Sequence, residues 1–177
     1  MTSCPRFMRT KNHILQSIIA CGKLELQNKT EDKKMAYSID VAAARALATK
    51  AHEGQTDKAG LPYITHPERV ALRMESPELQ VIGWLHDTVE DTPIALQDIE
   101  GAFGPETAAA VDAISRRDGE KWSDYLDRVA ANPMARQVKI SDLIDNSNLS
   151  RIPHATLKDV ERQKKYNKAL KKLLEKE

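Results

Sequence analysis

From Ser38 to the end of the chain, apolar residues recur at intervals of three and four, which is the spacing of one face of an α-helix. Ser38 can cap the first helix, and Gly54 closes it before a loop. A short helix is predicted next, from about Pro67 to Met74.

Proline and glycine divide the rest of the chain into further helices. Ser76 followed by Pro77 is typical of a helix start and predicts a central helix from Glu78 to Glu90. Further helices are predicted over residues 94–103, 106–115, 122–131, 134–148 and 157–177. No stretch longer than a few residues alternates with the period of a β-strand. The pattern predicts an all-α single domain, a bundle of about seven to nine helices.

Residues 1–37 differ from the rest, because a basic start is followed by a short apolar patch and a polar stretch. At most one short helix is expected here, near residues 11–22. The patch that ends in Cys21 faintly resembles a bacterial lipoprotein signal, but polar residues interrupt it. We interpret residues 1–37 as an N-terminal extension, either disordered or upstream of a natural start at Met35, and residues 38–177 as the domain.

The balance of charged residues limits which kinds of partner the chain is expected to bind. Lys and Arg number 27 against 26 Asp and Glu, so no bulk field attracts nucleic acid or a membrane surface. Cys4 and Cys21 form no disulfide framework, which makes a reducing cytoplasm the expected location. No apolar run reaches the roughly 18–20 residues that span a bilayer. We therefore expect neither nucleic acid nor membrane as a partner.

The C-terminal helix is basic and amphipathic. We interpret its lysines as a solvated face rather than as a nucleic-acid site. Its apolar stripe predicts packing on the core or on a second copy in a homodimer; the stripe consists of Tyr166, Leu170, Leu173 and Leu174.

The stretch from Val81 to Thr92 concentrates ionisable groups among apolar residues. It holds His86, Asp87, Glu90 and Asp91, and on one continuous helix their spacings of three and four would place all four on one broad face. Charged groups in apolar surroundings need pairing or a metal. Acidic groups near a helix C-terminus also oppose the macrodipole, and such a cost hints at a function.

Two other segments supply residues of the same kind, His66 in YITHP and Asp142 in VKISDLIDN. With His86 and Asp87 they make two imidazoles and two carboxylates, a set suited to a divalent first-row metal such as manganese, iron or zinc. A metal ion lowers the pKa of water and makes a nucleophile near neutral pH. Each residue alone has an ordinary interpretation, since a histidine before a proline is usually a loop residue and His-Asp pairs occur by chance.

Five segments in order, AHEGQTDKAGLPYITHP, LHDTVEDT, FG, VDAISR and VKISDLIDN, resemble the HD-domain hydrolases of the RelA/SpoT type. The resemblance covers about residues 38–150. In length the chain is similar to the stand-alone small alarmone hydrolases. The resemblance implies an HD-domain helical fold and removal of the 3′-pyrophosphate from ppGpp or a related nucleotide.

The resemblance also implies roles for single residues. His66, His86, Asp87 and Asp142 match the metal ligands of the family, usually for Mn²⁺. Glu90 and Asp91 match the acidic pair that orients the attacking water and handles its proton. Asn146 matches an asparagine that contacts the ribose, and Lys58 matches a basic residue of the nucleotide pocket.

Two positions depart from the pattern of the family. The first loop usually reads Gln-x-Arg-Lys, with an arginine that can stack on guanine, whereas Asp57 occupies that position here. The segment Asp-Arg-x-His-Asn is replaced by one in which Leu143 and Asp145 occupy the cationic positions. We expect these changes to alter residues that face the substrate.

The departures leave alternatives open. The chain can be an HD phosphohydrolase that acts on another nucleotide or phosphoester, including NADPH or adenosine alarmones. A non-catalytic nucleotide sensor is the third alternative, and it predicts binding without turnover.

Overall fold

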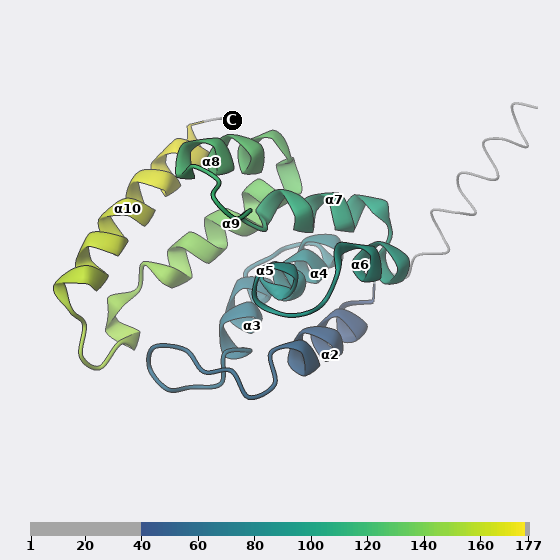
Figure 1. The fold of residues 1–177 in the computed structure, drawn as a ribbon, viewed down its shortest axis with the longest axis horizontal. Coiled ribbons are helices and arrows are strands. Elements are labelled where there is room, and N and C mark those ends of the chain that lie inside the picture. Colours follow the sequence, from purple (N-terminus) through teal and green to yellow (C-terminus); the bar gives the residue numbers. More distant parts are fainter. Residues whose placement is uncertain (1–39, 176–177) are drawn as a thin grey trace, which may run out of the picture. The chain divides into compact units, whose positions relative to one another are not determined.

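The computed structural model describes residues 40–175, which form helices and loops (Figure 1). The elements are α2 (Val41–Ala51), α3 (Thr65–Leu72), α4 (Pro77–Leu85), α5 (Thr88–Asp91), α6 (Leu96–Phe103), α7 (Pro105–Ile114), α8 (Trp122–Ala131), α9 (Pro133–Asn146), the 3₁₀ turn η1 (Leu149–Arg151) and α10 (Leu157–Leu174). Within residues 40–175 the β pairing is limited to one bridge, between Thr56 and Pro62. The all-helical prediction is confirmed. The predictions for residues 1–37 and the Ser38 cap lie outside the described residues.

Side-chain caps fix where several helices begin. The carboxylate of Asp40 accepts the N–H of Ala43 at 3.0 Å and starts α2. Ser76 caps α4, where Pro77 occupies the first turn as predicted. Asn132 caps α9 in the same way. Side-chain caps thus account for the predicted starts of α4 and α9, and α2 begins at a cap, Asp40, that was not predicted.

The predicted central helix from Glu78 to Glu90 is wrong in one respect, because it is interrupted at His86 and Asp87. Helix α4 ends at Leu85, and α5 begins at Thr88. The Thr88 hydroxyl donates to the Leu85 carbonyl at 2.7 Å, and the Nδ1 of His86 donates to the Gly83 carbonyl at 2.8 Å. These side chains satisfy carbonyls at the end of α4 and stabilise the break.

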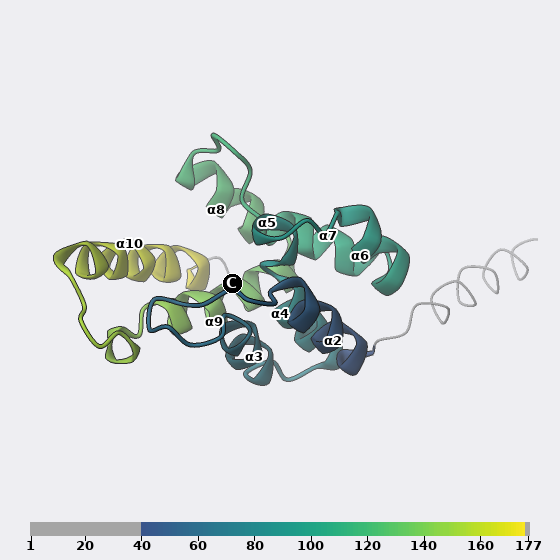
Figure 2. The same ribbon diagram turned by 60° about the horizontal axis from the view of Figure 1, so that its bottom comes forward.

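Two apolar clusters form the core, and α9 contributes to both. The larger cluster is built from α2, α3, α4, α6, α7 and the buried Ala135 and Val138 of α9. The smaller one joins α8 and α10 to Leu143 of α9. Figures 1 and 2 show α9 between α3 and α4 on one side and α10 on the other. Helix α9 is therefore held by packing from both sides.

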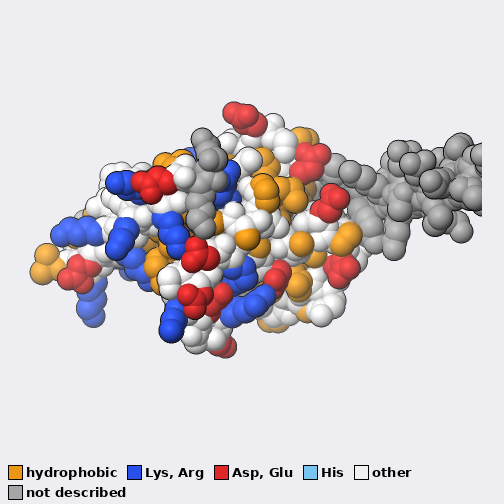
Figure 3. Space-filling view, turned by 90° about the horizontal axis from the view of Figure 1, so that it is seen from above, with side chains coloured by type: hydrophobic (Ala, Val, Ile, Leu, Met, Phe, Trp, Pro, Cys, Tyr) orange, Lys and Arg blue, Asp and Glu red, His pale blue; other side chains and the backbone are white. Residues whose placement is uncertain are grey.

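The stripe predicted on the C-terminal helix packs largely on the core. Tyr166, Leu170 and Leu173 lie in the smaller cluster, whereas Leu174 is 50% exposed. Basic side chains gather over the end of the molecule that carries α8 and α10 (Figure 3). No described helix combines the length and the hydropathy that a membrane crossing requires.

Helices α3 and α4 approach closely at Gly83. A Cβ added there would lie 2.8 Å from the Cα of Ala71 and 3.1 Å from its amide nitrogen. We predict that Gly83→Ala destabilises the fold by about 1–3 kcal/mol through overpacking. Urea unfolding followed by circular dichroism measures the change.

Gly101→Ala is the matched control, because a Cβ at this exposed position of α6 meets nothing within 4 Å. It should leave stability unchanged or raise it by about 0.4–1 kcal/mol. Equal stabilities for the two variants would contradict the close approach of α3 and α4.

Candidate metal centre and flanking pockets

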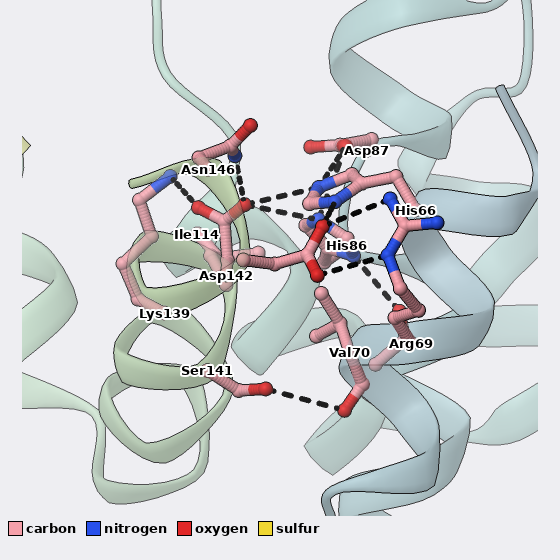
Figure 4. A network of polar contacts seen from close by, with 12 residues as sticks. His66, Arg69, Val70, His86, Asp87, Ile114, Lys139, Ser141, Asp142 and Asn146 are labelled. Carbon is pink, nitrogen blue, oxygen red and sulfur yellow. Dashed lines mark hydrogen bonds and ion pairs between the residues drawn. The ribbon is translucent and has the colours of Figure 1, made fainter. Parts of the chain in front are cut away.

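Three buried side chains from three helical segments converge at one point. The ligand atoms of His66, His86 and Asp142 all lie within 4.8 Å of one another. Asp87 adjoins them, with its Oδ2 3.0 Å from the Nε2 of His86 and 3.6 Å from the Nε2 of His66. Figure 4 shows these four side chains pointing toward each other from α3, the α4–α5 break and α9. The structure brings all four predicted ligands together.

The loop before α3 places His66 in the first helical turn. The Thr56–Pro62 bridge and the bond from the Tyr63 N–H to the Gln55 carbonyl, at 2.9 Å, close this loop. Gly60 adopts a φ of 78°, which a residue with a side chain rarely adopts. The closed loop thus positions His66 against Asp142 of α9.

The break between α4 and α5 aims His86 and Asp87 at the same point. His86 is buried and anchored through Nδ1 to the Gly83 carbonyl, so Nε2 faces the cluster. Asp87 accepts the phenol of Tyr63 at 2.6 Å. On a continuous helix the two side chains would diverge by about 100°.

Asp142 is buried on α9 between cationic and polar partners. Its Oδ2 lies 2.7 Å from the Nζ of the half-buried Lys139, and its Oδ1 accepts the side-chain amide of Asn146. Oδ1 also lies 3.0 Å from the Nε2 of His66. Burial alone would raise the pKa of Asp142, but Lys139 and the two imidazoles hold it well below its usual range. The carboxylate is therefore ionised.

The two imidazoles carry buried nitrogen atoms that lack good partners. The Nε2 atoms of His66 and His86 make no hydrogen bond of acceptable geometry with any residue from 40 to 175, although carboxylate oxygens lie near them. Nitrogen and carboxylate donors around one point form a set that fits a divalent first-row cation. The residues present thus fit a metal ion.

Glu90 and Asp91 lie on α5 at the exposed rim of this centre. The Oε2 of Glu90 accepts the N–H of Arg116 at 2.7 Å, and Asp91 accepts the Tyr63 phenol at 3.4 Å. Burial, together with the negative charge of Asp87, raises the pKa of both carboxyl groups. A carboxylate whose pKa lies closer to neutrality is a better acceptor of a proton from water.

Two pockets flank the centre, and Tyr63 and Asn146 line both. The first, called here the loop pocket, has a volume of about 240 Å³ and is lined by Thr56, Asp57, Lys58, Ala59, Tyr63, His66, Asn146, Asn148, Arg151, Ile152 and Arg162. The second, called the aromatic pocket, has a volume of about 280 Å³ and is lined by Tyr63, Asp87, Glu90, Asp91, Arg116, Trp122, Tyr125, Lys139, Asp142, Asn146, Lys165 and Tyr166.

The predicted substrate residues lie beside these pockets, with partners that the sequence does not reveal. Lys58 lines the loop pocket but pairs with Asp159 of α10 at 2.7 Å. Asp57 turns back on its own loop, where Oδ1 accepts the N–H groups of Ala59 and Leu61 at 2.8 and 3.0 Å. Its Oδ2 lies 3.6 Å from Arg151, so the acidic side chain is partly neutralised.

Asp145 does not face the substrate side, and here our expectation is wrong. It is fully buried, and its carboxylate accepts from Arg69 at 2.9 and 3.0 Å and from the Nδ1 of His66 at 2.8 Å. Arg73 and Arg151 approach the same group. Burial would raise its pKa, but the hydrogen bonds from His66 and Arg69 lower it below the usual range.

Sequence reasoning missed Tyr63 and Lys139. Tyr63 lies in the YITHP segment, three positions before His66, and Lys139 precedes Asp142 by the three positions that place both on one helix face. These spacings are the available signal. The other cations and aromatic rings of the aromatic pocket come from α8, α10 and the loop before α8, and no local motif links them.

Metal affinity should depend on pH. Burial opposes the charged imidazolium, but Asp87 and Asp142 raise the pKa of His86 to about 10, and Asp142 and Asp145 raise that of His66. A raised pKa keeps each ring protonated to a higher pH, so an ion must displace protons. Mn²⁺ affinity should therefore rise steadily from about pH 6 to 8. Titration calorimetry in buffers of different ionisation enthalpy measures the affinity and the proton release; a constant affinity would contradict the assignment.

Comparisons with known proteins find an HD-domain family and two bacterial relatives. A family profile described as HD domain matches residues 44–175. The bifunctional (p)ppGpp synthase/hydrolase SpoT of Escherichia coli K12 is 41% identical over 93 residues, which cover 50% of this chain and 13% of that protein. The guanosine-3′,5′-bis(diphosphate) 3′-pyrophosphohydrolase of Aquifex aeolicus is 29% identical over 140 residues, 71% of this chain and 20% of that protein.

A solved structure of a metazoan ortholog of SpoT, described as hydrolysing ppGpp, superposes with a TM-score of 0.65 and 21% identity. The match covers 76% of this chain and 84% of that one, and it confirms the fold. The chain spans a fifth or less of the length of the two bacterial relatives. With the profile matched over most of its length, the chain belongs to the HD domain family.

Proposed function

We propose that the chain is a metal-dependent hydrolase that removes the 3′-pyrophosphate from (p)ppGpp or a related alarmone nucleotide. The observation that carries the proposal is the buried convergence of His66, His86 and Asp142, with Asp87 adjoining and Glu90 at its rim. The names of the bacterial relatives, which are (p)ppGpp hydrolases, support the choice of substrate. A small nucleotide in the cytoplasm is the partner that this function requires.

His66, His86, Asp87 and Asp142 would hold a divalent ion, and Mn²⁺ is the ion that we favour from the resemblance. A divalent ion at this point would polarise a phosphoryl oxygen and lower the pKa of water. The chain orients His86, Asp87 and Asp142 through separate contacts. The Gly83 carbonyl holds His86, Tyr63 holds Asp87, and Lys139 and Asn146 hold Asp142.

Glu90 is the residue to which we assign acceptance of the proton from the attacking water. Its Oε2 is oriented by the N–H of Arg116, and its raised pKa suits a group that takes up and returns a proton near neutral pH. Asp91 and Tyr63 lie beside it and would orient the water.

The two pockets fit a nucleotide with phosphates at two ends. Cations in the loop pocket are Lys58, Arg151 and Arg162, and those in the aromatic pocket are Arg116, Lys139 and Lys165. Asn146 lines both pockets and lies one turn beyond Asp142, and these two facts support its assignment as a contact of the ribose. Phosphate groups on either side of the ribose would then meet positive charge.

The substrate assay uses purified protein with Mn²⁺ and four nucleotides: ppGpp, pppGpp, ppApp and NADPH. We expect pyrophosphate release from the guanosine alarmones, measured by coupled pyrophosphatase and by chromatography of the nucleotide product. Turnover of NADPH or ppApp alone would contradict the assignment of a guanosine substrate and support one of the alternatives. The absence of turnover for all four, with Mn²⁺ bound, would refute the hydrolase assignment and favour a sensor.

Glu90→Gln should lower kcat by about 100-fold or more, because an amide accepts no proton at neutral pH. Mn²⁺ binding should persist, since the side chain is not among the proposed ligands. Glu100→Gln, on the exposed face of α6, is the matched control and should retain activity. Unimpaired turnover by Glu90→Gln would assign proton transfer to another group.

A further inference from the structure

Asp145 is a buried carboxylate surrounded by positive groups. Its exposure is 0%, and it receives a two-bond contact from Arg69, at 2.9 Å to Oδ1 and 3.0 Å to Oδ2. Arg73 donates to Oδ1 at 3.2 Å, and Arg151 lies 3.0 Å from Oδ2 and also donates to the Asp145 carbonyl at 3.0 Å. Three guanidinium groups thus compensate one charge and keep it ionised.

The fourth partner of Asp145 is His66. The Nδ1 of this ring lies 2.8 Å from the Oδ2 of Asp145, while its Nε2 lies 3.0 Å from the Oδ1 of Asp142. Asp142 and Asp145 are three apart on α9 and so share one face of that helix. One imidazole of α3 is therefore held between two carboxylates of α9.

The chemistry of the partners decides which nitrogen faces the centre. An ionised carboxylate only accepts hydrogen bonds, so Nδ1 of His66 must donate to Asp145. The remaining nitrogen, Nε2, is then the one directed at His86 and Asp142, as a metal ligand requires. The Gly83 carbonyl does the same for His86, because it also accepts from Nδ1. Two different acceptors thus impose one orientation on both rings.

The spacing on α3 supports the same arrangement. His66, Arg69 and Arg73 follow one another by three and four positions, so the helix presents the ring and two guanidinium groups to Asp145 together. Arg151 approaches from η1, where it also lines the loop pocket and lies 3.6 Å from Asp57. The carboxylate is therefore fixed by cations from two segments, and its hydrogen bond to His66 has a defined direction.

We propose that Asp145 is a positioning residue, whose carboxylate orients the imidazole of His66 as a metal ligand and is itself fixed by Arg69, Arg73 and Arg151. The inference rests on the proposed function in so far as it takes a divalent ion as the group that His66 binds. It assigns to Asp145 a role at the metal centre rather than at the substrate.

The test compares Asp145→Asn with the wild-type chain in Mn²⁺ binding, measured by titration calorimetry without nucleotide. An asparagine keeps the shape of the side chain but cannot accept from the ring and from three guanidinium groups with one oxygen. Loss of such an orienting partner should weaken Mn²⁺ binding about 10- to 100-fold. Binding within about threefold of wild type would overturn the proposal.

Asp159→Asn is the matched control. Asp159 is also buried and paired with cations, Lys58 at 2.7 Å and Arg162 at 3.2 Å, and these partners are not among the proposed ligands. A purely structural effect of losing a buried carboxylate would change the melting temperature of both variants and the Mn²⁺ affinity of neither. A matching loss of affinity in Asp159→Asn would overturn the specific role of Asp145.

A second measurement keeps the proposal testable where Asp145→Asn does not fold. Long-range ¹H–¹⁵N spectra of the Zn²⁺-loaded wild-type chain, assigned with His66→Gln, should show His66 protonated at Nδ1 and bound to Zn²⁺ through Nε2. Binding through Nδ1, or no binding of either ion, would overturn the proposal. Both measurements omit nucleotide, so failure of the hydrolase assignment would show itself separately, as absent turnover by a chain that binds metal.

Discussion

The burial of opposite charges between α3 and α9 is the constraint on which the rest of the site depends. His66 lies between Asp142 and Asp145, and none of the three is more than 4% exposed. Unpaired charges in such surroundings would cost several kcal/mol each. Helix α9 can carry two carboxylates into the interior because apolar residues on its other faces belong to both core clusters, which hold the helix in place.

The contacts that compensate these charges also orient the side chains that carry them. Lys139 pairs with the Oδ2 of Asp142. Asp145 accepts a hydrogen bond from the Nδ1 of His66, and the Gly83 carbonyl accepts one from the Nδ1 of His86. Each of these contacts occupies the side of a ligand that faces away from the centre. The opposite atoms are left to converge at one point, which is how a stable helical interior becomes a place for a divalent ion. In these three contacts, the atom that stabilises the side chain differs from the atom that faces the centre.

Sequence periodicity was sufficient for most helices, because helix starts depend on local caps and on proline. It failed at His86 and Asp87, where the break depends on hydrogen bonds from the side chains of His86 and Thr88 to backbone carbonyls. The expectation that both departures face the substrate failed at Asp145, which is buried, whereas Asp57 lines the loop pocket. Their environment depends on Arg69 and Arg151, whose positions in the sequence give no sign of a contact with either aspartate. The ligand set could be proposed from the residue types and from the resemblance, but its convergence could be seen only in three dimensions.

The two acidic residues that replace cations therefore have different structural roles in this chain. At position 57 the carboxylate closes a turn and lies 3.6 Å from Arg151, which lines the loop pocket together with Lys58 and Arg162. At position 145 it is surrounded by guanidinium groups and bound to His66. In both cases the exchange is compensated by arginines from elsewhere in the fold. The charge that a nucleotide would meet is therefore set by the whole pocket, and neither substitution by itself argues against a phosphate-bearing substrate.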